Sequence, residues 1–410
     1  MREQARHLLL LGLLVVGGSA IGVVGAIVFT RDDGGGTSTA GGTAQTALPL
    51  HPVAGTFKTN DVTLEDCSEQ TCYEQAYGNI AYREGPKAAL ELFDRQYGDG
   101  SDPGCHRVAH TIGAAALARF AGNVAKTFAS GSSSCWSGYY HGVLERALLK
   151  VKSYDANALG DVARGLCDDR GVRAVSWLAY QCLHGLGHGL MITTGYDLPR
   201  SLGACKRLTD EWDQNSCKGG AFMENIATSY GIESRWVKAD DPVYPCNWVA
   251  YPDKNACYQL VTSRILRVVG PDWKRIAQIC ASVEDGWVST CFQSFGRDVS
   301  GTTHRDPKRI LKLCGVARPY GGERDCVLTA AMDMTANFTG GTQAARLCTA
   351  TSSALRASCF QAVGSIMARF ETTNAAREAA CRSIVRGTHD VSACIAGTRS
   401  IGAVPPQVAR

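Results

Sequence analysis

The stretch that decides the fold is residues 280–295, CASVEDGWVSTCFQSF, in which two cysteines enclose a turn and the second opens an apolar segment. Similar pairs recur, and the first members of the last five pairs lie 34, 34, 34 and 33 residues apart. A fixed period of this length is typical of helical-hairpin repeats. The sequence therefore predicts disulfides within each repeat unit: Cys167–Cys182, Cys205–Cys217, Cys246–Cys257, Cys280–Cys291, Cys314–Cys326, Cys348–Cys359 and Cys381–Cys394.

Each unit is predicted to contain two helices. Residues 306–314, DPKRILKLC, predict the first helix, because Asp306 suits the N-cap, Pro307 suits the first turn and the cysteine falls in the last turn. The second cysteine opens the second helix, where Phe292, Phe295 and Val299 recur at helical spacing. Each disulfide would then join the end of one helix to the start of the next.

We predict an all-α fold: a solenoid-like array of disulfide-stapled αα hairpins. Its architecture resembles tetratricopeptide and Sel1-like repeats over roughly residues 155–400. The cysteines here are more widely spaced and the Gly/Ala/Tyr signatures of those families are not evident. The resemblance therefore implies the helical-hairpin architecture alone.

The first four of the 18 cysteines, Cys67, Cys72, Cys105 and Cys135, do not follow the period. Neighbouring second helices would bring Cys105 to Cys135 and leave Cys67 with Cys72. Four cysteines allow three connectivities, and the sequence leaves the choice open.

The N-terminus predicts a membrane anchor. Basic residues in segment 1–7 precede an uncharged, largely apolar run over residues 8–30, which is long enough as a helix to cross a ~30 Å hydrocarbon core. Positive charge ahead of this run predicts a single-pass protein of the cell membrane, with its C-terminal body on the extracytoplasmic side. The alternative is a cleaved signal peptide. Both place the cysteines in an oxidising compartment, where disulfides persist.

The remaining chain is divided by composition. Residues 31–60 are rich in Gly and Thr and predict a flexible tether. Residues 61–200 form a histidine-rich part of the helical array, residues 201–400 contain the regular cysteine-paired repeats, and residues 401–410 form a tail. With 42 basic and 38 acidic residues the net charge is +4, so we expect no nucleic-acid partner.

Five of the nine histidines lie between residues 106 and 188. His106 and His110 are four residues apart, as are His184 and His188, and this spacing puts two imidazoles on one helix face. His141 is six residues past Cys135 and His188 is six past Cys182, so adjacent second helices would present them at equivalent positions. The sequence therefore predicts a transition-metal site formed by His106, His110, His141, His184 and His188.

Glu145, four residues after His141, is a further candidate, either as a ligand or as a group that orients an imidazole. An all-imidazole set suits copper or zinc, and it suits iron less well. Tight helical packing, with the histidines bonded to the backbone or to tyrosines, is the structural alternative. No P-loop, G-x-S-x-G or H-E-x-x-H sequence is present, which excludes the enzyme classes that those motifs mark.

Glycine is dense around the histidines, as in residues 182–189, CLHGLGHG. Glycine inside a helix costs up to ~1 kcal/mol relative to alanine. Its density here indicates either close helix approach or space for a substrate. The later units lack this density.

Two functions are compatible with these features. The first is a membrane-anchored extracytoplasmic metal-binding protein that acts as a metalloenzyme, with a peptide or protein as one possible substrate. The second is a non-catalytic solenoid scaffold that binds a peptide or an envelope protein, with structural histidines. Bound metal in protein purified without added ions would favour the first function.

Overall fold

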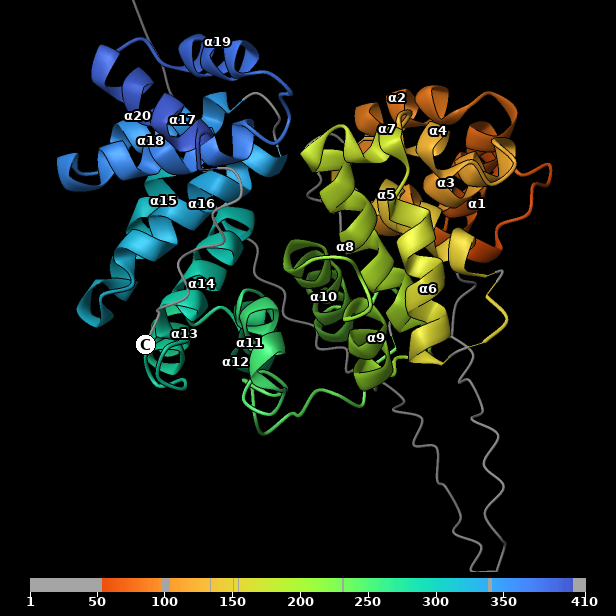
Figure 1. Ribbon diagram of the computed structural model, residues 1–410, viewed down its shortest axis with the longest axis horizontal. Coiled ribbons are helices and arrows are strands. Elements are labelled where there is room, and N and C mark those ends of the chain that lie inside the picture. The colour runs from red at the N-terminus through yellow and green to blue at the C-terminus, as the bar shows by residue number, and fades with distance from the viewer. Residues whose placement is uncertain are drawn as a thin grey trace, which may run out of the picture. The chain divides into compact units, whose positions relative to one another are not determined.

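The computed structural model describes residues 54–97, 104–132, 134–149, 151–153, 155–230, 232–337 and 341–400. Within these ranges every regular element is a helix, which confirms the all-α prediction (Figure 1). None of the described helices has the length and apolar character needed to span a bilayer. The predicted anchor, residues 8–30, the first part of the tether and the tail lie outside the described residues.

Most helices follow one another with short connections, and the longest connection between described helices is residues 227–250, between α10 and α11. The α-helices of the first part are α1 Gln70–Arg83, α2 Pro86–Tyr97, α3 Cys105–Arg119, α4 Val124–Phe128, α5 Ser134–Leu148, α6 Ala156–Cys167, α7 Arg170–Arg173, α8 Ser176–Thr193, α9 Leu198–Cys205 and α10 Glu211–Ile226. Those of the second part are α11 Tyr251–Tyr258, α12 Val261–Val269, α13 Trp273–Ala281, α14 Val288–Thr302, α15 Pro307–Cys314, α16 Glu323–Asn337, α17 Thr342–Ala350, α18 Ser353–Met367, α19 Asn374–Ile384 and α20 Thr388–Thr398. Three 3-10 helices complete the set: η1 Ala54–Thr56, η2 Leu64–Asp66 and η3 Gly315–Tyr320.

Aspartates fix where several first helices of the units begin. Asp197, Asp272 and Asp306 are the N-caps of α9, α13 and α15, and each carboxylate accepts a hydrogen bond from the backbone N–H three residues later. These bonds satisfy donors that a helix start otherwise leaves free. The predicted start at Asp306 is therefore confirmed, and a cap of this kind is worth roughly 1 kcal/mol.

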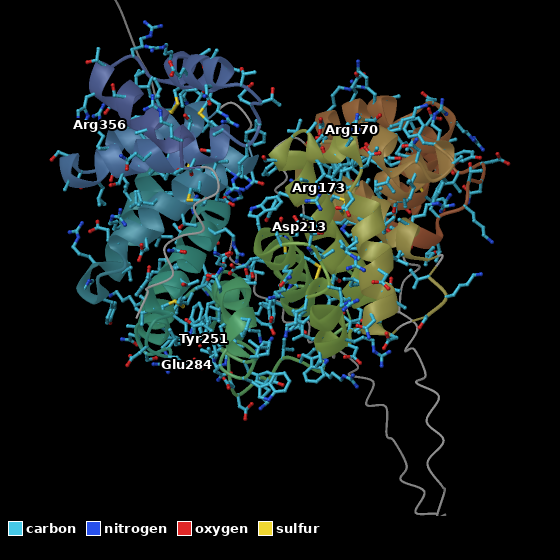
Figure 2. The ribbon with its side chains drawn as sticks, viewed as in Figure 1. Arg170, Arg173, Asp213, Tyr251, Glu284 and Arg356 are labelled. Carbon is cyan, nitrogen blue, oxygen red and sulfur yellow. A yellow bond between two sulfur atoms is a disulfide. The ribbon has the colours of Figure 1, made fainter. Side chains whose placement is uncertain are left out.

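All eighteen cysteines form disulfides, and the seven pairs predicted from the period are present, as Figure 2 shows in yellow for several of them. Of the three possible pairings of the first four cysteines, the structure has Cys67–Cys72 and Cys105–Cys135. A complete set of disulfides is typical of an extracytoplasmic or secreted protein.

Contrary to the prediction, the second cysteine does not open the second helix in every unit. In four units the helix begins six residues before its cysteine, at Ser176, Glu211, Ser353 and Thr388.

The unit with Cys246 and Cys257 departs furthest from the predicted hairpin. Cys246 lies in a run of turns rather than in a helix, and Cys257 lies near the end of the short α11. This helix ends at Tyr258, one residue after Cys257, and α12 begins after Leu260, which has non-helical dihedrals. The prediction that Cys257 opens a second helix was therefore wrong.

The second helices of successive units pack on one another. In the first part α3 packs on α5, α5 on α8 and α8 on α10, and in the second part α14, α16, α18 and α20 follow the same order (Figure 1). The buried apolar residues form two clusters, one from residues 54–230 and one from residues 191–394. This packing order is expected of neighbouring repeat units. The solenoid arrangement remains a prediction.

Close helix approach explains the glycines. A Cβ added to Gly187 of α8 would lie 2.0 Å from the Cys217 carbonyl oxygen, and one added to Gly220 of α10 would lie 1.8 Å from the His184 carbonyl oxygen. The same mutual approach joins α18 to α20, at Gly364 and Gly397. Of the two interpretations of the glycines, the structure supports helix packing. That packing is not confined to the histidine-rich part.

Buried ion pairs add to the disulfides. Arg173 of α7 donates to both carboxylate oxygens of Asp213 in α10, at 2.7 and 2.6 Å, and both residues are labelled in Figure 2. The Asp213 side chain is buried, and its charge raises the pKa of Arg173. Arg356 of α18, which is more exposed, also donates to both carboxylate oxygens of Asp390 in α20.

The packed body begins before the predicted end of the tether at residue 60. Ala54 and Phe57 are buried, and the Arg146 guanidinium of α5 donates to the carbonyl oxygens of Gly55 and Phe57 at 3.1 and 2.8 Å. The segment lacks periodic apolar residues, so this contact could not be predicted from the sequence.

Removing one C-terminal disulfide should lower stability without disturbing the histidines. We expect Cys348→Ala combined with Cys359→Ala to reduce the free energy of unfolding by about 2–4 kcal/mol, because the bridge closes a loop with a sequence separation of 11. Denaturant unfolding measures the change. An unchanged unfolding midpoint would contradict a stabilising role for the bridge.

Candidate metal centre

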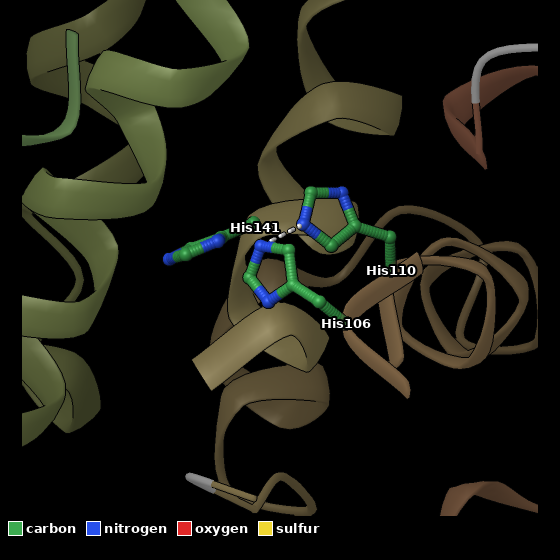
Figure 3. Close-up of side chains that lie close together, drawn as sticks. All are labelled: His106, His110 and His141. Atoms are coloured by element: carbon green, nitrogen blue, oxygen red, sulfur yellow. Dashed lines mark hydrogen bonds between the residues drawn. The ribbon is translucent and has the colours of Figure 1, made fainter. Parts of the chain in front are cut away.

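Three neighbouring helices bring all five predicted histidines together. His106 and His110 come from α3, His141 from α5, and His184 and His188 from α8. Figure 3 shows His106 and His110 side by side, with the His141 ring facing them from α5. The i, i+4 spacing places each pair on one helix face, as predicted, and the close packing of the helices brings those faces together.

The donor atoms of these rings fall into two groups of three. One group is His106, His110 and His141, and the other is His141, His184 and His188; within each, one nitrogen per residue lies within 4.8 Å of the others. Metal–nitrogen bonds of ~2.1 Å put the donors of a tetrahedral ion about 3.4 Å apart. Either group can hold a metal ion after small movements of the rings.

The site is buried, and burial favours the neutral form of four of its imidazoles. His110, His141 and His188 are at most 1% exposed, His184 is 6% exposed and His106 is partly exposed. Burial, assisted by the charge of His110, lowers the pKa of His106 to about 3, and burial lowers the pKa of His184 to about 4. Burial also holds the pKa values of His141 and His188 well below the usual range. The neutral ring is the form that binds a metal.

The outer nitrogens of three rings are held by acceptors. His188 Nδ1 lies 2.8 Å from Glu224 Oε2, His106 Nδ1 lies 2.8 Å from the Cys135 carbonyl oxygen, and His110 Nδ1 contacts Glu145 Oε1. Because a carbonyl or carboxylate oxygen accepts, each Nδ1 carries the hydrogen and each Nε2 presents a lone pair. Carboxylates and carbonyls in this position orient metal-binding histidines and raise their basicity.

The surroundings of the inner nitrogens are unusual. His110 Nε2 lies 3.0 Å from His106 Nε2, the contact drawn as a dashed line in Figure 3. With a hydrogen on each Nδ1, the two Nε2 lone pairs point at each other, and a cation between them would satisfy both. Both ring nitrogens of His141, and Nε2 of His188, are buried without a hydrogen-bond partner among the described residues. Orphaned buried polar atoms are uncommon and costly in folded proteins.

Glu145 and Glu224 contact the outer nitrogens of the histidines and also accept hydrogen bonds from other groups. Glu145 Oε2 accepts from the Tyr230 hydroxyl at 2.6 Å and from the Gly55 N–H at 3.4 Å. Glu145 was predicted either to bind the metal or to orient an imidazole, and its position matches the second role.

Glu224 is held in the same way. It accepts from the Tyr196 hydroxyl at 2.9 Å and from the backbone N–H and hydroxyl of Ser229, each at 2.7 Å. Burial raises its pKa to about 7, against the lowering effect of the bonds from Ser229.

Several supporting residues could not be recognised from the sequence. Tyr230 and Ser229 lie in the connection after α10, and Tyr196 lies between α8 and α9, so no periodicity marks them. Glu224 had a weak signal, because it lies seven residues after Cys217 on the second helix of the next unit. His184 is further flanked by the Tyr180 ring, which stacks on it at a centroid distance of 5.3 Å.

Comparison of the chain with protein-family models, with curated proteins and with solved structures finds no match. The function is therefore argued from the geometry and chemistry of the histidine cluster.

Proposed function

We propose that the protein is an extracytoplasmic metalloenzyme whose five clustered histidines bind copper or zinc. The observation that carries this proposal is the facing pair of His106 and His110, whose Nδ1 atoms are bonded to acceptors and whose Nε2 atoms meet at 3.0 Å. A cation between them would satisfy both lone pairs. The orphaned nitrogens of His141 and His188 support the same conclusion.

The donor set favours copper or zinc over harder metals. Every candidate donor is an imidazole nitrogen, and imidazole suits copper and zinc. Both nearby carboxylates are engaged with histidines, tyrosines and backbone N–H groups, so neither is free to bind an ion. Iron centres with open positions usually combine histidines with a carboxylate ligand, which makes iron the weaker candidate.

The geometry supports catalysis rather than a purely structural metal. Three imidazoles per group leave one position of a tetrahedral ion open, as in catalytic zinc sites, whereas structural sites have four protein ligands. His106 and His184 are the least buried of the five, so a reactant would approach from their side. A metal bound there would supply Lewis-acid or redox chemistry, and the chain would supply orientation and a largely water-free environment.

The cellular setting is part of the proposal. The disulfides indicate an oxidising compartment. We further propose that residues 8–30 anchor the body to the cell membrane and that a peptide or protein is one possible substrate. Release of the protein from membranes only by detergent, and not by salt or alkali, would support the anchor.

Elemental analysis tests the proposal directly. The full chain, purified without added metal and with no metal-affinity step, is expected to contain copper or zinc at one or more equivalents per chain. Copper or zinc added to metal-free protein should also bind with submicromolar affinity. Protein that contains neither ion and binds both more weakly than micromolar would contradict the proposal.

Replacing the glutamate that orients His188 should weaken metal binding without removing a ligand. We expect Glu224→Gln to lower metal affinity about 10–100-fold, because an amide no longer provides the charge that orients and polarises His188. Competition with a chelator measures the affinity. Glu284→Gln is the matched control, since Glu284 pairs with Lys254 in the C-terminal part and should leave affinity unchanged. Equal affinity in both variants would contradict the role of Glu224.

One observation favours the scaffold function as a second candidate. Trp248 and Tyr251 are 55% and 67% exposed, and Trp248 is stacked on Trp236 at a centroid distance of 5.4 Å. Exposed aromatic groups of this kind are frequent where proteins bind partners. Metal-free wild-type protein that binds a peptide from a defined library, and a Trp248→Ala variant that does not, would favour this alternative.

A further inference from the structure

The two histidine groups share a single member. His106 and His110 belong to one group, His184 and His188 belong to the other, and His141 belongs to both. Donors bound to one ion cannot be more than about 4.2 Å apart, which is twice a metal–nitrogen bond. The five rings are arranged as two groups of three, so one ion does not account for all of them.

His141 differs from the other four rings in its contacts. It is 1% exposed, and both of its nitrogens lack a hydrogen-bond partner among the described residues. Each of the others has a polar contact at a ring nitrogen: Cys135 for His106, Glu145 for His110, Glu224 for His188, and Tyr180 and Ser216 for His184. A ring with two unengaged nitrogens can bind an ion through each of them.

The position of His141 also fits two ions. Its ring centroid lies 5.3 Å from those of His106 and His110 on one side. It lies 5.7 and 4.0 Å from those of His184 and His188, which belong to the next helix. The His141 and His188 rings are stacked at an interplanar angle of 17°, so one of them has to turn before both can bind the same ion in their ring planes. The two nitrogens of an imidazole point in diverging directions, so one ring set between two groups can reach into both.

The two groups are built alike. Each consists of an i, i+4 pair on one helix together with His141, and in each the second histidine of the pair is bonded through Nδ1 to a buried glutamate. The two groups therefore offer equivalent donor sets on either side of His141.

We infer that the centre holds two metal ions, about 6 Å apart, bridged by His141 as an imidazolate. This inference rests on the proposed function and specifies its nuclearity. Binding of the second ion forms a metal–nitrogen bond at the protonated nitrogen of His141 and releases that proton to solvent. No atom is oxidised or reduced in this step.

Titration of the full chain with Cu(II), followed by elemental analysis and electron paramagnetic resonance, tests the inference. We expect two ions per chain and a low-temperature signal well below that of two independent spins, because an imidazolate couples two Cu(II) ions antiferromagnetically. His106→Ala and His184→Ala each remove a ligand from one group only. Each variant should therefore bind one ion tightly and show the full signal of one spin.

The outcomes separate the inference from the proposed function. Saturation at one ion per chain, or two ions with two uncoupled spins, would overturn the shared His141 and leave the metalloprotein proposal standing. Binding of no ion would overturn both. His106→Gln and His184→Gln keep more of the side-chain volume, and they replace any alanine variant whose circular dichroism shows that it has not folded.

Discussion

Gly220→Ala is expected to destabilise the protein by up to about 2 kcal/mol and to disrupt the metal centre. The added Cβ would lie 1.8 Å from the His184 carbonyl oxygen and 3.2 Å from the Gly187 Cα. Both are backbone atoms, so no side-chain rotation relieves the contact, and α10 has to move away from α8. Overpacking of this kind typically costs 1–3 kcal/mol and outweighs the ~1 kcal/mol by which alanine favours a helix.

The same movement would affect metal binding, because Glu224, on α10, orients His188. Thermal unfolding and metal content measure the two effects. Gly165→Ala is the matched control: Gly165 is an exposed position of α6 at which a Cβ meets nothing within 4 Å. That variant should be as stable as wild type or slightly more stable. Wild-type stability in Gly220→Ala would show that the two helices do not approach as closely as described.

His141→Ala is expected to give the largest loss of metal of any single histidine variant. His141 belongs to both groups, whereas each of the other four histidines belongs to one. We therefore expect the variant to lose both ions at chelator concentrations that leave wild type fully loaded. The metal-free variant should still fold, because the substitution also removes two buried nitrogens that have no partner.

The control for His141→Ala is His389→Ala. His389 is an exposed residue of α20, in the C-terminal part, and contacts Asp390 rather than the cluster. Its substitution should leave metal content unchanged. If His141→Ala retained as many ions as this control, His141 would not be a ligand.

The cysteine period predicted most of the disulfides because each bridge depends on local geometry. A cysteine at the end of one helix and a second shortly after the turn face each other wherever the chain forms a hairpin. The Cys246–Cys257 bridge was predicted as well, but the helices of its unit were not, since the break at Leu260 and the turns around Cys246 depend on packing that no periodicity records.

The histidine cluster was predictable for a similar reason. The i, i+4 pairs follow from helix geometry, and the common distance of His141 and His188 from a cysteine follows from the repeat. The residues that contact these histidines and their glutamates were harder to predict from the sequence. Tyr230 reaches Glu145 across 85 residues of sequence, and Glu224 reaches His188 from the next helix pair, so only the folded chain reveals these contacts.

Anomalous X-ray diffraction from crystals of the full chain, recorded at the copper and zinc absorption edges, would locate the metal ions directly. We expect metal peaks within about 2.1 Å of the inner nitrogens of His106, His110, His141, His184 and His188. Peaks elsewhere on the molecule, or none among these histidines after crystals are soaked in either metal, would contradict the proposed metal centre.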